Sequence, residues 1–214
     1  YAFGHAMERD ASMAVVKAGG KIVGSVRHPI NAPDFASFLL QAQSSGAKVI
    51  ALANAGADVI NAIKQAHEFG IGKSRQKLAG MVLVISDVRA LGLEAAQGSI
   101  LTETFYWDLN DLTREFSKRF SARMKNGAVP TMTQAGVYAA TLHYLKSLKV
   151  LGVNPHDGRK VVAEMKELPT DDPAFGKGYI RGDGRKMHPA YLFEVKSPSD
   201  SKGPWDYYRI TATI

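Results

Sequence analysis

The sequence contains no cysteine, and this absence removes three kinds of chemistry at once. Without cysteine the chain forms no disulfide, holds no metal through a thiolate and carries no thiol nucleophile. No window approaches 18 consecutive apolar residues, so no segment is predicted to span a membrane. What remains is a chain of 214 residues with 45% hydrophobic residues, which is enough for a packed core.

Sequence motifs of catalysis are absent as well. The patterns HExxH, G-x-S-x-G and G-x-G-x-x-G do not occur, and the histidines have no metal-ligand spacing. Neighbouring carboxylates, such as Asp108 with Asp111 and Asp171 with Asp172, are typical of helix starts. We therefore expect no enzyme activity, no cofactor and no metal ion.

The formal net charge is +7, which raises the question of a nucleic acid partner. Lysine and arginine are scattered along the chain, and aromatic residues are not interleaved with them as a base-stacking surface would require. The basic residues are therefore interpreted as a solvated surface, and no nucleic acid partner is expected.

Strand-like and helical segments alternate in the first half of the chain. Short apolar runs occur roughly every 30 residues, at 22–26, 49–53, 81–85 and 99–105. Amphipathic helices between them predict βαβ units and a doubly wound parallel sheet, with 22–26 and 49–53 as neighbouring strands. Because the chain opens on a helix without a preceding strand, we expect it to be part of a longer protein.

The pattern changes after about residue 126. Helices are predicted at 111–125, 133–150 and 158–168, and strands at 178–181, 191–195 and 205–212. The sequence Gly182-Asp183-Gly184 predicts a hairpin turn. We expect the helix at 133–150 to pack away from the first sheet.

Open α/β sheets bind ligands at the carboxyl ends of their strands. The loops expected there are 1–4, 54–57, 86–88 and 106–110, and they contain aromatic residues, small residues, asparagine and aspartate. They contain no pairing of a nucleophile with a base. This composition favours binding without turnover.

Five segments occur in a characteristic order: YAFGHAME, DFASFLLQAQSSGAKVI, NAIKQAHEFGI, TQAGVYAATLHYL and YLFEVK. Together they resemble the C-terminal lobe of type I periplasmic solute-binding proteins of the branched-chain amino acid ABC transporter group. The resemblance implies two doubly wound lobes that close on a ligand. Residues 1–128 would form most of the C-terminal lobe, 129–190 would return to the N-terminal lobe, and 191–214 would return to the C-terminal lobe.

The same resemblance implies a function. The protein would be the periplasmic solute-binding component of an ABC importer, with a small ligand and a membrane permease as partners and no signal peptide in this fragment. Two alternatives stay open. One is a ligand-sensing effector domain of a regulator on the same fold, and the other is an α/β enzyme whose catalytic residues lie in the missing half.

The resemblance also implies ligand-binding residues. Phe3, beside Tyr1, matches a family aromatic that often carries a hydroxyl, and core packing is its alternative role. Asn54, Ala55 and Gly56 match the next loop, whose amides would hold an anionic or carbonyl group, although Asn54 also suits a plain turn. Ser86 and Asp87 stand where a family acidic residue holds a ligand ammonium group, and Asp87 also suits a helix cap.

The aromatic run Phe105-Tyr106-Trp107 departs from the amino acid binders and resembles relatives that take up small aromatic carboxylates. Tyr106 and Trp107 are predicted to line the site, while alternation sends one or two of the three rings into the core. The predicted ligand is therefore a small amino acid or an aromatic or other organic acid.

Overall fold

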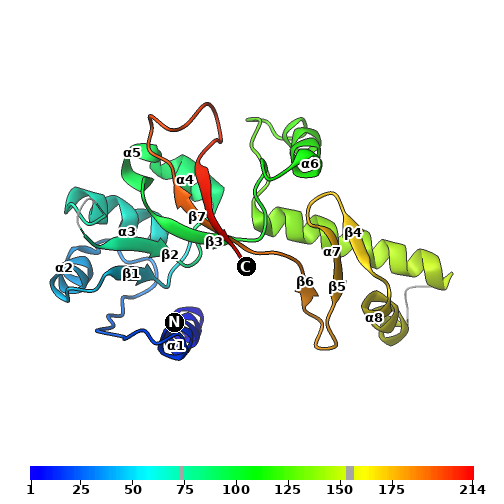
Figure 1. Cartoon of the computed structure of the whole chain (residues 1–214), viewed down its shortest axis with the longest axis horizontal. Coiled ribbons are helices and arrows are strands. Elements are labelled where there is room, and N and C mark those ends of the chain that lie inside the picture. Colours follow the sequence, from blue (N-terminus) through cyan, green and yellow to red (C-terminus); the bar gives the residue numbers. More distant parts are fainter. Residues whose placement is uncertain (73–74, 153–156) are drawn as a thin grey trace. The chain divides into compact units, whose positions relative to one another are not determined.

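The computed structural model describes residues 1–72, 75–152 and 157–214. These residues form two compact units, whose helices and strands are labelled in Figure 1. The first unit comprises Tyr1–Thr102 with Leu192–Ala212, and the second comprises Glu103–Tyr191 with Thr213–Ile214. Within this described part, no helix is both long enough and apolar enough to cross a lipid bilayer.

A five-stranded sheet with the order β1-β2-β3-β7-β8 is the centre of the first unit (Figure 1). Its strands are β1 (Val49–Leu52), β2 (Lys77–Gly80), β3 (Ile100–Glu103), β7 (Tyr191–Val195) and β8 (Tyr208–Thr213). Strands β1, β2 and β3 run parallel, with Ile50 opposite Leu78 and Gly80 opposite Leu101. The α/β class with a parallel sheet is therefore confirmed.

Helices precede or connect the strands of the first unit. They are α1 (Ala2–Lys17), α2 (Ala36–Ser44), α3 (Ala57–Glu68), α4 (Ile85–Leu91) and α5 (Leu93–Ala96). Val59, Ile63 and Ala66 of α3 lie on one buried face, as a period of about 3.6 residues requires. In contrast, α1 buries none of its side chains.

The second unit combines helices with a small antiparallel sheet. It contains α6 (Asp111–Ser121), α7 (Met132–Leu151), α8 (Gly158–Glu167), β4 (Thr170–Asp172), β5 (Gly176–Ile180) and β6 (Lys186–Met187). Phe105, Phe116, Ala135 and Ala174 form its buried apolar cluster. The hairpin predicted at 182–184 is confirmed, because β5 and β6 pair antiparallel across that turn.

Residues 22–26 do not form the predicted strand, and they do not pair with β1. Ile22, Val23 and Val26 are each more than a third exposed. A strand needs a neighbour that satisfies its backbone N–H and C=O groups, and no strand of the described residues pairs with this segment. The segment is tied instead to α1, where Glu8 accepts a hydrogen bond from Ser25 and forms a 3.1 Å ion pair with Arg27.

The strand predicted at 81–85 is also wrong, because β2 ends at Gly80 and α4 begins at Ile85. A short apolar run is compatible with a strand or with a helix start, and periodicity alone does not separate them. After Gly80 the chain turns back so tightly that a Cβ at this position would lie 2.6 Å from Cβ of Leu83. Residues 81–84 are therefore the loop at the carboxyl end of β2.

Candidate ligand-binding site

The carboxyl ends of β1, β2 and β3 define the edge at which open α/β sheets bind ligands. The chain leaves these strands through residues 53–56, 81–84 and 104–110. The first two loops belong to the first compact unit, and the third belongs to the second unit. The sequence-based prediction placed the middle loop too late, at 86–88.

Asn54 is the polar residue of the loop after β1, and it is buried. The residue is 3% exposed, and its Nδ2 donates a hydrogen bond of 3.0 Å to Nε2 of His28. Ala55 is half-buried, and Gly56 is exposed at the start of α3 with a φ of +61°. Glycine suits this turn because a residue with a Cβ rarely adopts such a φ. The predicted residues Asn54, Ala55 and Gly56 thus lie together at the end of β1.

The segment between α1 and α2 holds this loop in place. Nδ1 of His28 donates to the Pro29 carbonyl at 2.8 Å, so Nε2 of the neutral ring is the acceptor for Asn54. The backbone N–H of Asn31 donates to Oδ2 of Asp58 at 3.1 Å. The remaining oxygens, Oδ1 of Asn54 and Oδ1 of Asp58, are buried and have no hydrogen-bond partner in the part of the chain that the structure describes.

Tyr1 and Phe3 form an aromatic surface at the start of α1. Their rings stack with centroids 5.8 Å apart, and the residues are 46% and 42% exposed. The first turn of α1 lies against the end of β1, because a Cβ added at Gly4 would lie 3.1 Å from the carbonyl oxygen of Ala53. Phe3 is therefore an exposed ring near the loop that carries Asn54, not a core residue of this unit.

The loop after β2 is apolar, and sequence reasoning missed it. Met81, Val82 and Val84 are half-buried, and Leu83 is buried. The available signal was Gly80, which interrupts the apolar run where the chain turns. This loop adds hydrophobic surface to the same edge of the sheet.

Ser86 and Asp87 lie beyond that loop, in the first turn of α4. Ser86 is exposed, whereas Oδ2 of Asp87 accepts a hydrogen bond of 3.1 Å from the backbone N–H of Val84. Burial raises the pKa of the Asp87 carboxyl, and the hydrogen bond from Val84 opposes this shift. The contact with Val84 is the helix-start role that the sequence left open for Asp87.

In the second unit, the aromatic run is largely buried. Phe105 is 1% exposed and packs edge-on against Phe116, with ring centroids 5.8 Å apart. Tyr106 is buried as well, and Trp107 is half-buried against the same cluster. This agrees with the expectation that one or two of the three rings enter the core. A ligand contact by Tyr106 or Trp107 stays a prediction.

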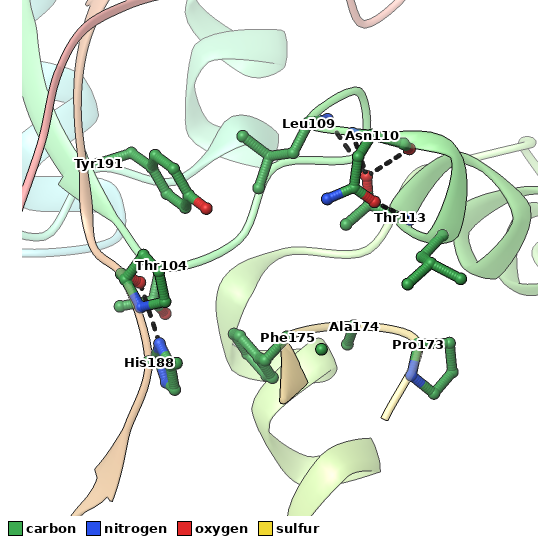
Figure 2. Close-up of a pocket in the computed structure, with 12 residues that line it drawn as sticks. Thr104, Leu109, Asn110, Thr113, Pro173, Ala174, Phe175, His188 and Tyr191 are labelled. Carbon is green, nitrogen blue, oxygen red and sulfur yellow. Dashed lines mark hydrogen bonds between the residues drawn. The ribbon is translucent and has the colours of Figure 1, made fainter. Parts of the chain in front are cut away.

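The second unit also contains a cavity of about 60 Å³, shown in Figure 2. Asn110 and Thr113 at its rim cap α6, because Oδ1 of Asn110 accepts from the Thr113 N–H at 3.0 Å. His188 donates to the Pro189 carbonyl at 3.0 Å, and its ring stacks on Phe175 with centroids 4.4 Å apart. These polar groups are engaged with the protein itself, and the volume suits a few water molecules better than a solute.

A larger hollow of about 480 Å³ lies in the first unit, at the amino ends of β2 and β3. Glu194 in this hollow is paired, because it lies 2.6 Å from Arg209 and 3.5 Å from Lys77. This is the edge opposite to the one where open α/β sheets bind ligands. We therefore do not assign it to the solute.

The predicted site residues fall into three places. Tyr1, Phe3, Asn54, Ala55 and Gly56 surround the end of β1, Ser86 and Asp87 lie in α4, and Tyr106 and Trp107 lie in the second unit. Across the described ranges, no group of three or more His, Asp or Glu side chains could hold a metal ion. The end of β1 offers a flat apolar surface and buried hydrogen-bonding groups, which suits a small organic molecule.

Comparison with known proteins identifies relatives of the whole chain. A family model described as periplasmic binding protein matches residues 1–203. None of the curated proteins matches the chain.

Several solved structures are similar. A periplasmic binding protein from Burkholderia mallei is 50% identical with a TM-score of 0.91, and the match covers 100% of this chain and 56% of that protein. A branched-chain amino acid ABC transporter periplasmic ligand-binding protein from Burkholderia xenovorans LB400 is 43% identical with a TM-score of 0.88, with the same coverage of 100% and 56%. An ABC transporter solute-binding protein from R. palustris, in complex with 4-hydroxybenzoate, is 24% identical with a TM-score of 0.81, covering 96% and 56%. The chain thus spans little more than half the length of these relatives.

Proposed function

Because this chain belongs to the periplasmic binding protein family, we propose that it is part of the solute-binding component of an ABC importer. The component works in the periplasm, binds a small molecule between two lobes and delivers it to a membrane permease. Two relatives are named as ligand-binding or substrate-binding proteins of ABC transporters, which supports this role.

The observation that carries the proposal is the composition of the edge at which β1 ends. Tyr1 and Phe3 present stacked, half-exposed rings, and Asn54 presents a buried amide from the adjoining loop. Aromatic and apolar walls with a few placed polar groups are typical of small-molecule sites. No step of chemistry is needed to account for these groups.

The lobe assignment from the sequence remains part of the proposal. Residues 1–128 and 191–214 would belong to the C-terminal lobe, and residues 129–190 to the N-terminal lobe. In the structure, α6 lies in the same compact unit as α7, and that unit begins at Glu103.

Two ligand classes fit the proposal. One is a branched-chain amino acid, in keeping with the role named for the Burkholderia xenovorans relative, with Asp87 meeting the ammonium group. The other is a small aromatic carboxylate such as the 4-hydroxybenzoate bound by the R. palustris relative, with the ring of Phe3 as a wall. Both classes pair a compact apolar body with polar ends.

A thermal-shift panel on the full-length protein tests the proposal. The panel contains leucine, isoleucine and valine, and benzoate with its hydroxylated derivatives. A ligand that binds only the folded state raises the Tm according to its affinity. We expect stabilisation by one class and no chemical change in the ligand, which mass spectrometry checks after incubation.

The site is then tested with Phe3→Ala and calorimetry. Loss of the stacking area should weaken binding by about 1–3 kcal/mol. Phe69→Ala is the matched control, because Phe69 is a 37% exposed ring at the opposite end of α3. Equal affinities of these two variants would mean that the cleft is placed wrongly, and a panel without any hit would contradict the proposed function.

A further inference from the structure

Two buried oxygens, in the loop after β1 and in the first turn of α3, lack a hydrogen-bond donor in the described part of the chain. Oδ1 of Asn54 and Oδ1 of Asp58 belong to residues that are 3% and 4% exposed, and neither has a partner among the described residues. A buried acceptor without a donor is costly in free energy. Both residues lie at the carboxyl end of β1, so hydrogen-bond donors on a ligand would satisfy these two oxygens.

His28 determines which end of the Asn54 amide is left without a partner. Nδ1 of His28 donates to the Pro29 carbonyl at 2.8 Å, and Nε2 accepts from Nδ2 of Asn54 at 3.0 Å. If the amide turned round, Oδ1 would face Nε2, and both atoms are acceptors. The ring is held edge-on against Phe35, with centroids 4.8 Å apart, so its plane is fixed by packing.

Asp58 also presents an acceptor oxygen, as Asn54 does. Its Oδ2 accepts from the backbone N–H of Asn31 at 3.1 Å, which leaves Oδ1 as a second acceptor beside the Asn54 loop. The Asp58 carboxylate also places a negative charge in the first turn of α3. A ligand carboxylate is disfavoured next to it, and a hydrogen-bond donor is favoured.

We propose that His28 is a positioning residue that presents Asn54 as an acceptor, so that this loop selects solutes bearing a hydroxyl, amino or ammonium group. The inference rests on the proposed function and adds a selection rule to it. A hydroxyl or one N–H of the solute meets Asn54, and an ammonium group keeps further N–H donors for Asp87. The carboxylate of the solute does not bind at the start of α3.

The first experiment needs no ligand. Nitrogen-15 spectra of the full-length protein should show His28 with its proton on Nδ1. The side-chain N–H signals of Asn54 should shift in His28→Leu and stay unchanged in His67→Leu, because His67 lies at the other end of α3. A His28 ring with its proton on Nε2 overturns the proposal, since Asn54 would then have to offer Oδ1 to that ring.

The second experiment measures discrimination between matched solutes. Calorimetry compares 4-hydroxybenzoate with benzoate, and L-leucine with 4-methylpentanoate, which lacks the amino group. In the pair that binds, the wild type should favour the member with the donor by at least about fivefold. If a different member of the panel binds, calorimetry compares its affinity with that of the analogue that lacks the hydrogen-bond donor.

Substitutions of His28 distinguish a role in orienting the Asn54 amide from a role in supporting the loop alone. His28→Leu should bring the affinity ratio of the two matched solutes close to one. His28→Gln should keep most of the preference for the solute with the donor, because the glutamine side-chain oxygen can still accept from Asn54. His67→Leu should leave the ratio unchanged. Equal weakening of both solutes in His28→Leu, with the ratio kept, overturns the proposal. If no solute binds at all, the proposed function fails, and the spectra still decide the polarity of the pair.

Discussion

Asp87 carries a charge that its surroundings disfavour. Burial raises its pKa, and the hydrogen bond from Val84 only partly opposes this. A raised pKa means that folding favours the protonated form, so the stability that Asp87 contributes is present below its unfolded pKa of about 3.9. That contribution is lost as the pH rises through the folded pKa. We predict that Asp87→Asn gains stability relative to the wild type as the pH rises from about 4 to about 7.

Thermal denaturation of both proteins across this pH range measures the effect. The Tm of the variant minus that of the wild type should increase with pH. Asp183→Asn is the control, because hydrogen bonds from Arg181 and Arg185 lower the pKa of Asp183 to about 2. The Tm of Asp183→Asn minus that of the wild type should be constant above about pH 4 and change only in more acidic solution. A flat difference for Asp87→Asn would contradict the prediction.

Residue types predicted part of the site, but their contacts were not predictable. Asn54 could be recognised because it directly follows a strand-like apolar run. His28 could not, because its role depends on a segment 26 residues earlier in the chain that folds back onto the end of β1. The proton on Nδ1 depends in turn on the Pro29 carbonyl. The contact between His28 and Asn54 therefore depends on the tertiary fold and could not be predicted from the sequence.

At the scale of elements, helices were predicted more reliably than strands. The apolar period of α3 and the lengths of α7 and α8 follow from local sequence, because a helix satisfies its own hydrogen bonds. A strand depends on its neighbours. Residues 22–26 have strand-like composition but no partner strand among the described residues. Residues 81–84 are a loop that leads into α4 at Ile85.

Gly80 is the last residue of β2, and Gly80→Ala should destabilise the protein. The added Cβ would lie 2.6 Å from Cβ and 3.2 Å from Cδ2 of Leu83, so the loop after β2 would have to move. Overpacking of this kind costs about 1–3 kcal/mol. Chemical denaturation of the full-length protein measures the loss.

Gly158→Ala provides the matched control for that substitution. Gly158 is the exposed first residue of α8, and an added Cβ would meet no atom of the described residues within 4 Å. Its effect should stay within about 0.5 kcal/mol. If Gly80→Ala were equally mild, the tight turn at Leu83 would not be what ends β2.

At the scale of the whole molecule, α7 exposes large apolar side chains. It buries small and polar residues, Ala135, Ala139, His143 and Ser147. Its larger apolar residues Val137, Leu145 and Val150 are 64%, 54% and 60% exposed. A helix normally turns its apolar side to a core. The similar solved proteins are longer than this chain, and we propose that residues of their kind cover this face in the full-length protein.

The exposed side of α7 leads to a prediction about association. The 214-residue chain produced alone should self-associate, because exposed apolar side chains in water favour contact between copies. The double substitution of Val137→Ser and Leu145→Ser should shift it toward the monomer in sedimentation experiments, whereas Thr141→Ser on the same helix should not. In the full-length protein the double substitution should instead lower the Tm, because there the face is buried. A 214-residue chain that stays monomeric at high concentration would mean that α7 needs no cover.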